Sequence, residues 1–228
     1  MPVTDVPLAD TRDMYMAHAM FRREFGSLPS LIRAVRGGDK DRVKILGDHF
    51  ELLNNVLTHH HHAEDVYLWP RLLDRAVQEA SSVVETMESQ HAAIEKLDAE
   101  AVAAVGAWRV AGSATSAEAA AGVLDELAAV LKEHMATEEA RALPLAEKYI
   151  TAAEWGEMVQ SEAADVEPDL MPLLFGLMIY EGDPELIDEI VGNMPPEIRQ
   201  MLKPLATQAF AAHAELVYGT ATPPRGTL

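Results

Sequence analysis

Residues 58–70 read Thr-His-His-His-His-Ala-Glu-Asp-Val-Tyr-Leu-Trp-Pro, and this stretch governs how the rest of the chain is interpreted. On a helix, His60 and Glu64 lie one turn apart on the same face. An imidazole and a carboxylate that project inward from one helix are two metal ligands on a rigid element. The stretch alone fits two other interpretations equally well, an exposed surface patch and a His-rich tract that binds metal loosely.

The apolar residues around this stretch select one of its histidines. The positions that share a helical face at spacings of three and four are Leu53, Val56, Leu57, His60, Glu64, Tyr67 and Leu68. His60 continues this stripe, whereas we expect His59, His61 and His62 to be mostly exposed. His61 is also a candidate hydrogen-bond partner of a metal ligand. An inward-facing His61 together with Asp65 would contradict this choice of register.

The same pattern recurs 74 positions later. The counterparts of Leu53, Val56, Leu57, His60, Glu64, Asp65 and Pro70 are Leu127, Val130, Leu131, His134, Glu138, Glu139 and Pro144. Met14 and His18 recur 73 positions on, as Met87 and His91. The sequence therefore contains two copies of a helical hairpin that has a lone histidine on its first helix and His-x-x-x-Glu on its second. Chance supplies one such pair easily, but two pairs in one register much less easily.

Composition limits the class of protein. The 228 residues are 49% hydrophobic but only 6% aromatic, which is typical of a helical chain with a substantial core. A net charge of -19 makes nucleic acid and anionic membranes poor partners. The absence of cysteine excludes disulfides, thiolate zinc sites and iron–sulfur clusters. With no apolar leader, and with residues 170–180 too short to span a bilayer, we expect a cytoplasmic protein.

Helical periodicity predicts an all-α fold. After an extended arm at residues 1–9, the expected helices cover about 10–36, 39–75, 81–108 and 116–149, with Asp39 and either Thr115 or Ser116 as N-caps. Short connections make this an antiparallel up-and-down four-helix bundle over residues 10–150. Residues 151–228 form a helical extension, with helices near 152–166, 173–180, 185–191 and 197–218. It is expected to pack on the bundle or on a second subunit, giving a monomer or a homodimer.

Facing helices would bring six side chains together in the bundle core. They are His18, His60, Glu64, His91, His134 and Glu138. Four imidazoles and two carboxylates suit two borderline ions such as iron or manganese better than calcium or magnesium. Glu95, one turn after His91, is a candidate additional ligand, although a surface role fits it equally. Tyr15 and Tyr67 are candidate hydrogen-bond partners of the ligands, with a core role favoured. His49 and His213 are not expected to bind metal.

The pattern His18 … His60-x-x-x-Glu64 … His91 … His134-x-x-x-Glu138, over about residues 10–150, resembles the hemerythrin-like (HHE cation-binding) family, in its bacterial type with a C-terminal helical extension. The resemblance implies a non-haem di-iron centre (Fe2+/Fe3+) bridged by the two carboxylates and an oxo or hydroxo group. Manganese and zinc are potential substitutes. It places His18 and His60 on one iron, and His91 and His134 on the other.

The chain departs from the invertebrate oxygen carriers of that family at two points. Those carriers have His-x-x-x-His on the third helix, where this chain has Glu95 after His91, and His-x-x-x-x-Asp on the fourth, where this chain has His-x-x-x-Glu. One iron therefore lacks its third histidine.

The resemblance implies a protein that binds or senses O2 at its di-iron centre. Enzyme-like detoxification of peroxide (catalase-like) or of nitric oxide, and iron-dependent regulation, are the alternatives. The partner would be a small diatomic ligand or peroxide. The sequence has no glycine-rich nucleotide loop and no catalytic triad motif, so we assign no catalytic residue beyond the metal site.

Overall fold

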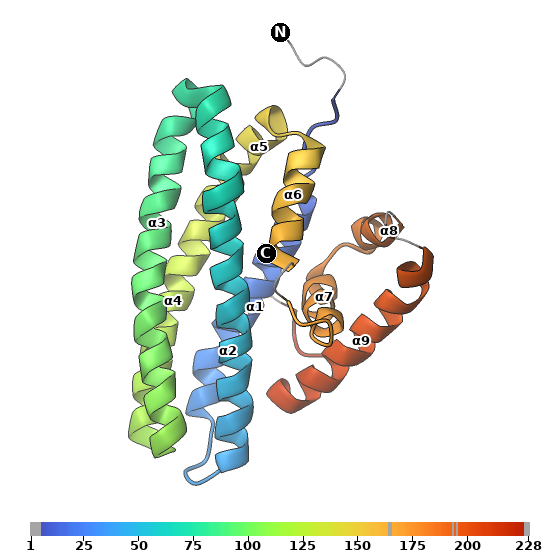
Figure 1. Ribbon diagram of the computed structural model, residues 1–228. Coiled ribbons are helices and arrows are strands. Elements are labelled where there is room, and N and C mark those ends of the chain that lie inside the picture. The colour runs from blue at the N-terminus through green and yellow to red at the C-terminus, as the bar shows by residue number, and fades with distance from the viewer. Residues whose placement is uncertain (1–5, 164–165, 193, 195, 226–228) are drawn as a thin grey trace.

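A computed structural model describes residues 6–163, 166–192, 194 and 196–225. The helices in chain order are α1 (Arg12–Arg33), α2 (Lys40–Ala63), a π-helical turn η1 (Glu64–Leu68), α3 (Trp69–Ala111), α4 (Ala114–Arg141), α5 (Leu143–Tyr149), α6 (Ala152–Ala163), α7 (Met171–Glu181), α8 (Pro184–Gly192) and α9 (Pro196–Tyr218). The prediction of an all-α bundle with additional C-terminal helices is confirmed (Figure 1).

Helices α1 to α4 form the bundle, and each of the pairs α1–α2, α2–α3, α3–α4 and α1–α4 is in contact. Short connections join them. Asp39 caps α2 by accepting a hydrogen bond from the Arg42 amide, as predicted. Gly112 ends α3 with φ at 58°, a left-handed conformation that glycine adopts without strain. The cap of α4 is Ser113 rather than Thr115 or Ser116, and the Ser116 side chain completes a capping box with it.

Two prolines disturb the predicted helices, and a kink at Pro70 is expected from the sequence. Pro70 lacks an amide hydrogen, and its ring crowds the carbonyl four residues earlier, which a widened π-helical turn at residues 64–68 relieves. The predicted gap between the helix that ends at 75 and the helix that begins at 81 is a kink at the single residue Ala76, with φ at -137° and ψ at 36°. The helix resumes directly after it. The predicted fourth helix is interrupted at Ala142, two residues before Pro144.

The metal-ligand candidates lie at the boundary between two apolar clusters. One cluster fills the bundle around Phe21, Leu57 and Trp108. The other fills its opposite end around Trp69 and also takes in Trp155 from α6. Helices α1, α2 and α3 contribute to both clusters, whereas α4 contributes to the first and the segment that follows it, Ala142 and α5, contributes to the second. The inward histidine of each helix falls between the two sets. These clusters cover the level at which the histidines meet toward both ends of the bundle.

The C-terminal helices lie against the bundle of the same chain (Figure 1). Helix α6 contacts α2 and η1, α7 contacts α1, and α9 contacts both α7 and α2. A Cβ atom at Gly176 would collide with the carbonyl oxygen of Ala206, so the close packing of α7 on α9 requires glycine there. The division of the chain at residue 150 remains a prediction.

The N-terminal arm is tied to the start of the extension. The Ala9 amide donates to the carbonyl of Ile150 at 2.9 Å, and the Ala152 amide donates to the carbonyl of Pro7 at 2.8 Å. Residues 1–5 of the predicted arm lie outside the described residues. Among the described helices, none has the length and apolar character needed to cross a membrane.

Candidate metal centre

All six predicted ligands are buried at one level of the bundle. Their exposed fractions are 0% for His18, 2% for His60, 0% for Glu64, 7% for His91, 1% for His134 and 0% for Glu138. They come from all four helices, and Glu64 is the first residue of the π-helical turn. Burying four imidazoles and two carboxylates without compensation would cost several kcal/mol, so the packing itself indicates a bound partner.

Each carboxylate lies between histidines from two helices. Glu64 has one oxygen 3.3 Å from Nε2 of His60 and the other 3.2 Å from Nε2 of His91. Oε2 of Glu138 lies 3.3 Å from Nε2 of His18 and 3.7 Å from Nε2 of His134. A carboxylate in this position can contact two ions at once, one on each side.

The six side chains fit a pair of cations. Within the described part of the chain, Nε2 of His18, His91 and His134 and both carboxylate oxygens of Glu138 are buried and form no hydrogen bond of regular geometry, and the contacts given above are ion-pair contacts within the cluster itself. Buried polar atoms almost always have a partner, and these five atoms converge on one interior space. Neutral imidazole nitrogen and ionised carboxylate oxygen are donors that divalent first-row metals accept.

The electrostatics of the fourth helix favour the metal-binding protonation states. Burial raises the pKa of Glu138, but the neighbouring imidazoles of His18 and His134 outweigh it and lower the pKa to about 2. Burial lowers the pKa of His134 to about 3. Glu138 is therefore ionised and His134 neutral at pH 7, which are the forms that ligate metals. For His18, burial lowers the pKa, but the carboxylates of Glu138 and Glu139 raise it by more, so its pKa lies above the usual value for histidine.

Two carboxylates behind the site orient the lone histidines. Nδ1 of His91 lies 2.8 Å from Oδ1 of Asp65, and Nδ1 of His18 lies 2.9 Å from Oε1 of Glu139. A carboxylate at Nδ1 holds the proton there and turns Nε2 toward the metal position. Sequence reasoning paired Asp65 with Glu139 in the repeat but gave them no role. The signal was present, because each directly follows the glutamate of its His-x-x-x-Glu pair.

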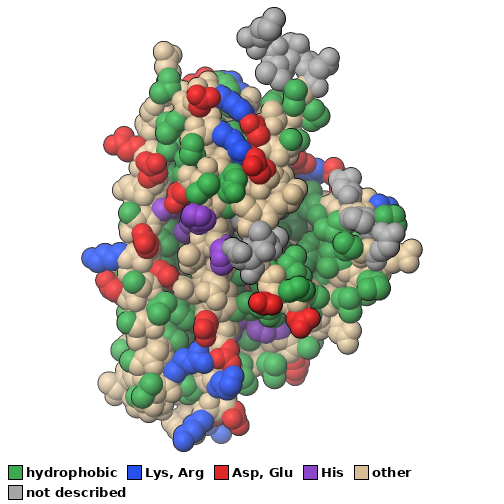
Figure 2. All heavy atoms as spheres, in the orientation of Figure 1, with side chains coloured by type: hydrophobic (Ala, Val, Ile, Leu, Met, Phe, Trp, Pro, Cys, Tyr) green, Lys and Arg blue, Asp and Glu red, His purple; other side chains and the backbone are tan. Residues whose placement is uncertain are grey.

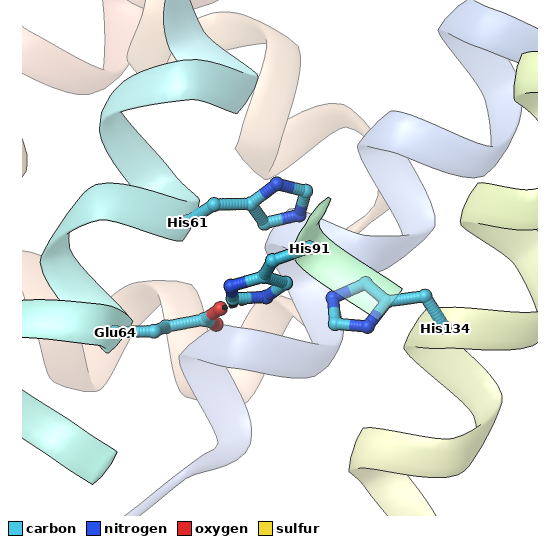
Figure 3. A group of neighbouring side chains, drawn as sticks. All are labelled: His61, Glu64, His91 and His134. Carbon is cyan, nitrogen blue, oxygen red and sulfur yellow. Dashed lines mark ion pairs between the residues drawn. The ribbon is translucent and has the colours of Figure 1, made fainter. Parts of the chain in front are cut away.

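The His61 ring is half-buried and is turned toward the centre. Its ring stacks on that of His91, with centroids 4.2 Å apart and an interplanar angle of 20°, and meets the His134 ring edge-on at 5.0 Å (Figure 3). Burial and the neighbouring histidines lower its pKa well below the usual value. The expectation that it is mostly exposed was wrong, because the inward direction of α2 passes between His60 and His61. His59 and His62 are exposed, as expected.

The remaining candidates lie farther from the interior space. Glu95 is exposed on α3, and Tyr15 is 40% exposed. Tyr67 packs against the apolar cluster around Trp69, with the Arg71 guanidinium 5.6 Å from the centre of its ring. Tyr67 therefore fits the favoured core role and Glu95 fits the surface role. The exposure of Tyr15 does not fit the core role that was favoured for it.

A cavity of about 510 Å³ leads to the centre from one face of the bundle. It lies between α2 and α3 and is lined by Leu57, Thr58, His61, His62, Asp65, Glu88, His91, Ala92, Ile94, Glu95 and Asp98. Figure 2 shows histidine side chains at the surface of the bundle with acidic side chains around them. A second cavity, of about 290 Å³ between α1 and α4, is lined by residues that include Phe21, Arg22 and Met135 and by none of the six ligand candidates.

A four-helix bundle with a buried cluster of imidazoles and carboxylates defines a helical metal-binding protein. The family model for the hemerythrin HHE cation binding domain matches residues 10–146, which is more than half of the chain, and the chain belongs to this family. Cation binding is therefore a property of the domain. No curated protein and no solved structure matches the chain.

Proposed function

We propose that the chain is a non-haem di-iron protein that binds or senses O2. In this proposal His18 and His60 hold one iron, His91 and His134 hold the other, and Glu64 and Glu138 bridge the two. The observation that carries it is the position of the two carboxylates, each within 3.7 Å of imidazole nitrogens from two different helices. Imidazole and carboxylate donors suit iron, and manganese or zinc are the competing occupants.

When bound, an iron pair supplies redox chemistry and an open coordination position for a small ligand. The chain's own residues supply the surroundings. Asp65 and Glu139 fix the rings of His91 and His18, so that each Nε2 keeps its direction. The apolar clusters cover the site toward both ends of the bundle, and the cavity beside His91 gives a small molecule access to it.

The test of this proposal is reversibility. The metal-free protein is loaded with iron(II) under anaerobic conditions, exposed to O2 and then purged, while its visible absorption is followed. An O2 binder is expected to gain an absorption band with O2 and to lose it on purging, over several cycles. Irreversible oxidation in the first cycle, with no reversible band, would exclude O2 carriage.

A second candidate function is reaction with peroxide or nitric oxide. It is favoured by the carboxylate at Nδ1 of each lone histidine, because such a partner makes the imidazole a stronger donor and stabilises the oxidised metal. Addition of hydrogen peroxide to the iron-loaded protein should then release O2, and the release should be slower in Asp65→Asn. Release no faster than from the same amount of free iron would reject the peroxide reaction.

A further inference from the structure

The extra imidazole beside the centre has no counterpart in the other half of the bundle. We propose that His61 is an additional ligand of the ion held by His91 and His134, so that the two metal positions are unequal. This inference rests on the di-metal centre proposed above and concerns the donors of one of its two ions.

The donor atoms around this ion are close enough to share it. One donor atom each from His61, Glu64, His91 and His134 all lie within 4.8 Å of one another. Donors on opposite sides of one ion are roughly 4.0 to 4.4 Å apart when metal–ligand bonds are about 2.0 to 2.2 Å. Because the His61 ring is stacked on that of His91, it must rotate about its Cβ–Cγ bond to turn a nitrogen toward the same ion. Figure 3 shows the four side chains gathered around one space.

The repeat explains why only one ion gains this donor. The position 74 residues after His61 is Met135, which is 2% exposed and packs in the apolar cluster around Phe21. A thioether is a poor ligand for iron(II) beside imidazoles and carboxylates. The group of donors on the other side consists of His18, His60 and Glu64, and His61 is not in it.

In this proposal His61, and not Glu95, is the additional ligand. The Glu95 side chain is exposed and lines the cavity, and it does not belong to either group of donors. His61 lines the inner end of the same cavity next to His91. The additional donor therefore comes from α2 and not from α3. The ion held by His18 and His60 keeps more open positions for a small ligand.

The experiment compares His61→Ala with two matched variants. His59→Ala removes an exposed histidine from the same helix, one whose Nδ1 lies 2.8 Å from the carbonyl oxygen of Asn55. Glu95→Ala removes the competing candidate ligand. Each full-length protein is loaded with 57Fe(II), and its iron content and Mössbauer spectrum are measured, with and without added imidazole. His61→Gln, which keeps most of the side-chain volume, replaces His61→Ala if the alanine variant does not fold.

We expect two unequal iron signals in the unsubstituted protein, and in His61→Ala a change in one of them. The affinity for that ion should fall by at least about 10- to 100-fold, and imidazole should restore it. His59→Ala should match the unsubstituted protein. An unchanged spectrum and iron content in His61→Ala, or the same loss in Glu95→Ala instead, would overturn the inference.

The outcomes also separate this inference from the function on which it rests. Two ions per chain together with no effect of His61→Ala would leave the di-iron function intact and remove His61 as a ligand. Uptake of one ion per chain by the unsubstituted protein would reject the di-iron function. In that case, weaker binding of the single ion by His61→Ala, rescued by imidazole, would still support ligation, and unchanged binding would overturn it.

Discussion

The orientation of two histidine rings in the candidate site depends on two carboxylates, those of Asp65 and Glu139. Asp65 and Glu139 each hold the Nδ1 atom of a lone histidine that comes from a different helix. Arg22 pairs with Glu139 at 2.8 Å on one side of the bundle, whereas Asp65 lines the open cavity on the other. Each half of the bundle therefore has a carboxylate at Nδ1 of its lone histidine, but the two carboxylates differ in their access to solvent.

Removing either of these charges should weaken metal binding. We expect Asp65→Asn and Glu139→Gln each to lower the affinity for one ion by about 10- to 100-fold, because the ring of the ligand loses its orientation and some basicity. Competition with a chromogenic chelator measures the affinity. Asp74→Asn and Glu126→Gln, at exposed positions, are the controls. Equal losses in the controls, or none in the two site variants, would contradict this role.

The positions of the six candidate ligands could be inferred from sequence because they repeat together with the apolar residues that aim them inward. His61 could not. Successive residues on a helix are about 100° apart, so a stripe centred between positions 60 and 61 brings both rings toward the core. Apolar periodicity at 3.6 residues locates such a centre only to within about half a residue.

At the scale of the helices, the boundaries depend on residues with local backbone effects. The π-helical turn and the break at Ala142 both precede a proline, at positions 70 and 144. Proline predicts that a helix is disturbed, but the form of the disturbance depends on how the next segment packs. The break at Ala76 directly follows the predicted end of the second helix at residue 75, although the break takes only one residue and alanine itself favours the helix.

The cap of α4 offers a direct test at this scale. We expect Ser113→Ala to reduce the free energy of unfolding by about 1 kcal/mol, since the first turn of α4 loses a hydrogen bond acceptor. For a chain of this size that lowers the melting temperature by roughly 2–4 °C. Thr115→Ala, at one of the two cap positions predicted from sequence, should lower the melting temperature by less. Equal shifts for the two variants, measured by calorimetry, would argue against a capping box at Ser113.

For the whole molecule, a buried polar cluster joins the extension to the bundle. Glu24 is fully buried on α1 and contacts Nε of Arg23 at 2.7 Å, Nε2 of His49 at 2.9 Å and the hydroxyl of Tyr218 on α9. Nε2 of His213, also on α9, lies 3.0 Å from Nδ1 of His49. His49 and His213 therefore have a structural role at this interface.

Acid should weaken this attachment. Burial and His49 lower the pKa of His213 to about 4, so the folded state resists a proton that the unfolded chain binds below about pH 6.5. For Glu24, burial raises the pKa, but His49, Arg23 and Tyr218 outweigh it and lower it to about 2. Both depressed pKa values stabilise the folded state at neutral pH. His213 loses its contribution as pH falls from about 6.5 to 4, and Glu24 loses its own from about 4.5 to 2.

Urea unfolding of the metal-free protein at several pH values measures this effect. The difference in unfolding free energy between the unsubstituted protein and His213→Gln should depend on pH between about 6.5 and 4, because only one of them carries the titrating imidazole. A difference that stays constant over this interval would show that His213 does not contribute to the pH dependence. The comparison also cancels the titration of the histidines in the metal centre.

Removal of residues 152–228 should destabilise the bundle or cause it to associate. The truncation uncovers Arg23 and Glu24 together with the apolar surface of α1 and α2 that α7 and α9 cover. Light scattering and thermal unfolding report the two effects. A truncated chain that is monomeric and as stable as the full chain would contradict this expectation.

Composition and periodicity predicted the all-α class and the presence of the C-terminal helices, but not the surface on which those helices pack. Apolar residues such as Leu177 and Phe210 require burial without indicating against what. The attachment depends on specific pairs such as Arg23 with Glu181, which join positions 158 residues apart. No local pattern in a single sequence relates positions at that separation.

The central claim is a two-ion centre held by four imidazoles and two bridging carboxylates, and metal stoichiometry tests it most directly. We expect two irons per chain in the reconstituted protein, measured by elemental analysis with the visible spectrum recorded under air and with peroxide. Glu64→Ala and Glu138→Ala should each weaken the binding of both ions, because in the proposed centre each carboxylate would bridge the two. A single ion per chain, or two ions retained with unchanged affinity in both variants, would contradict the claim.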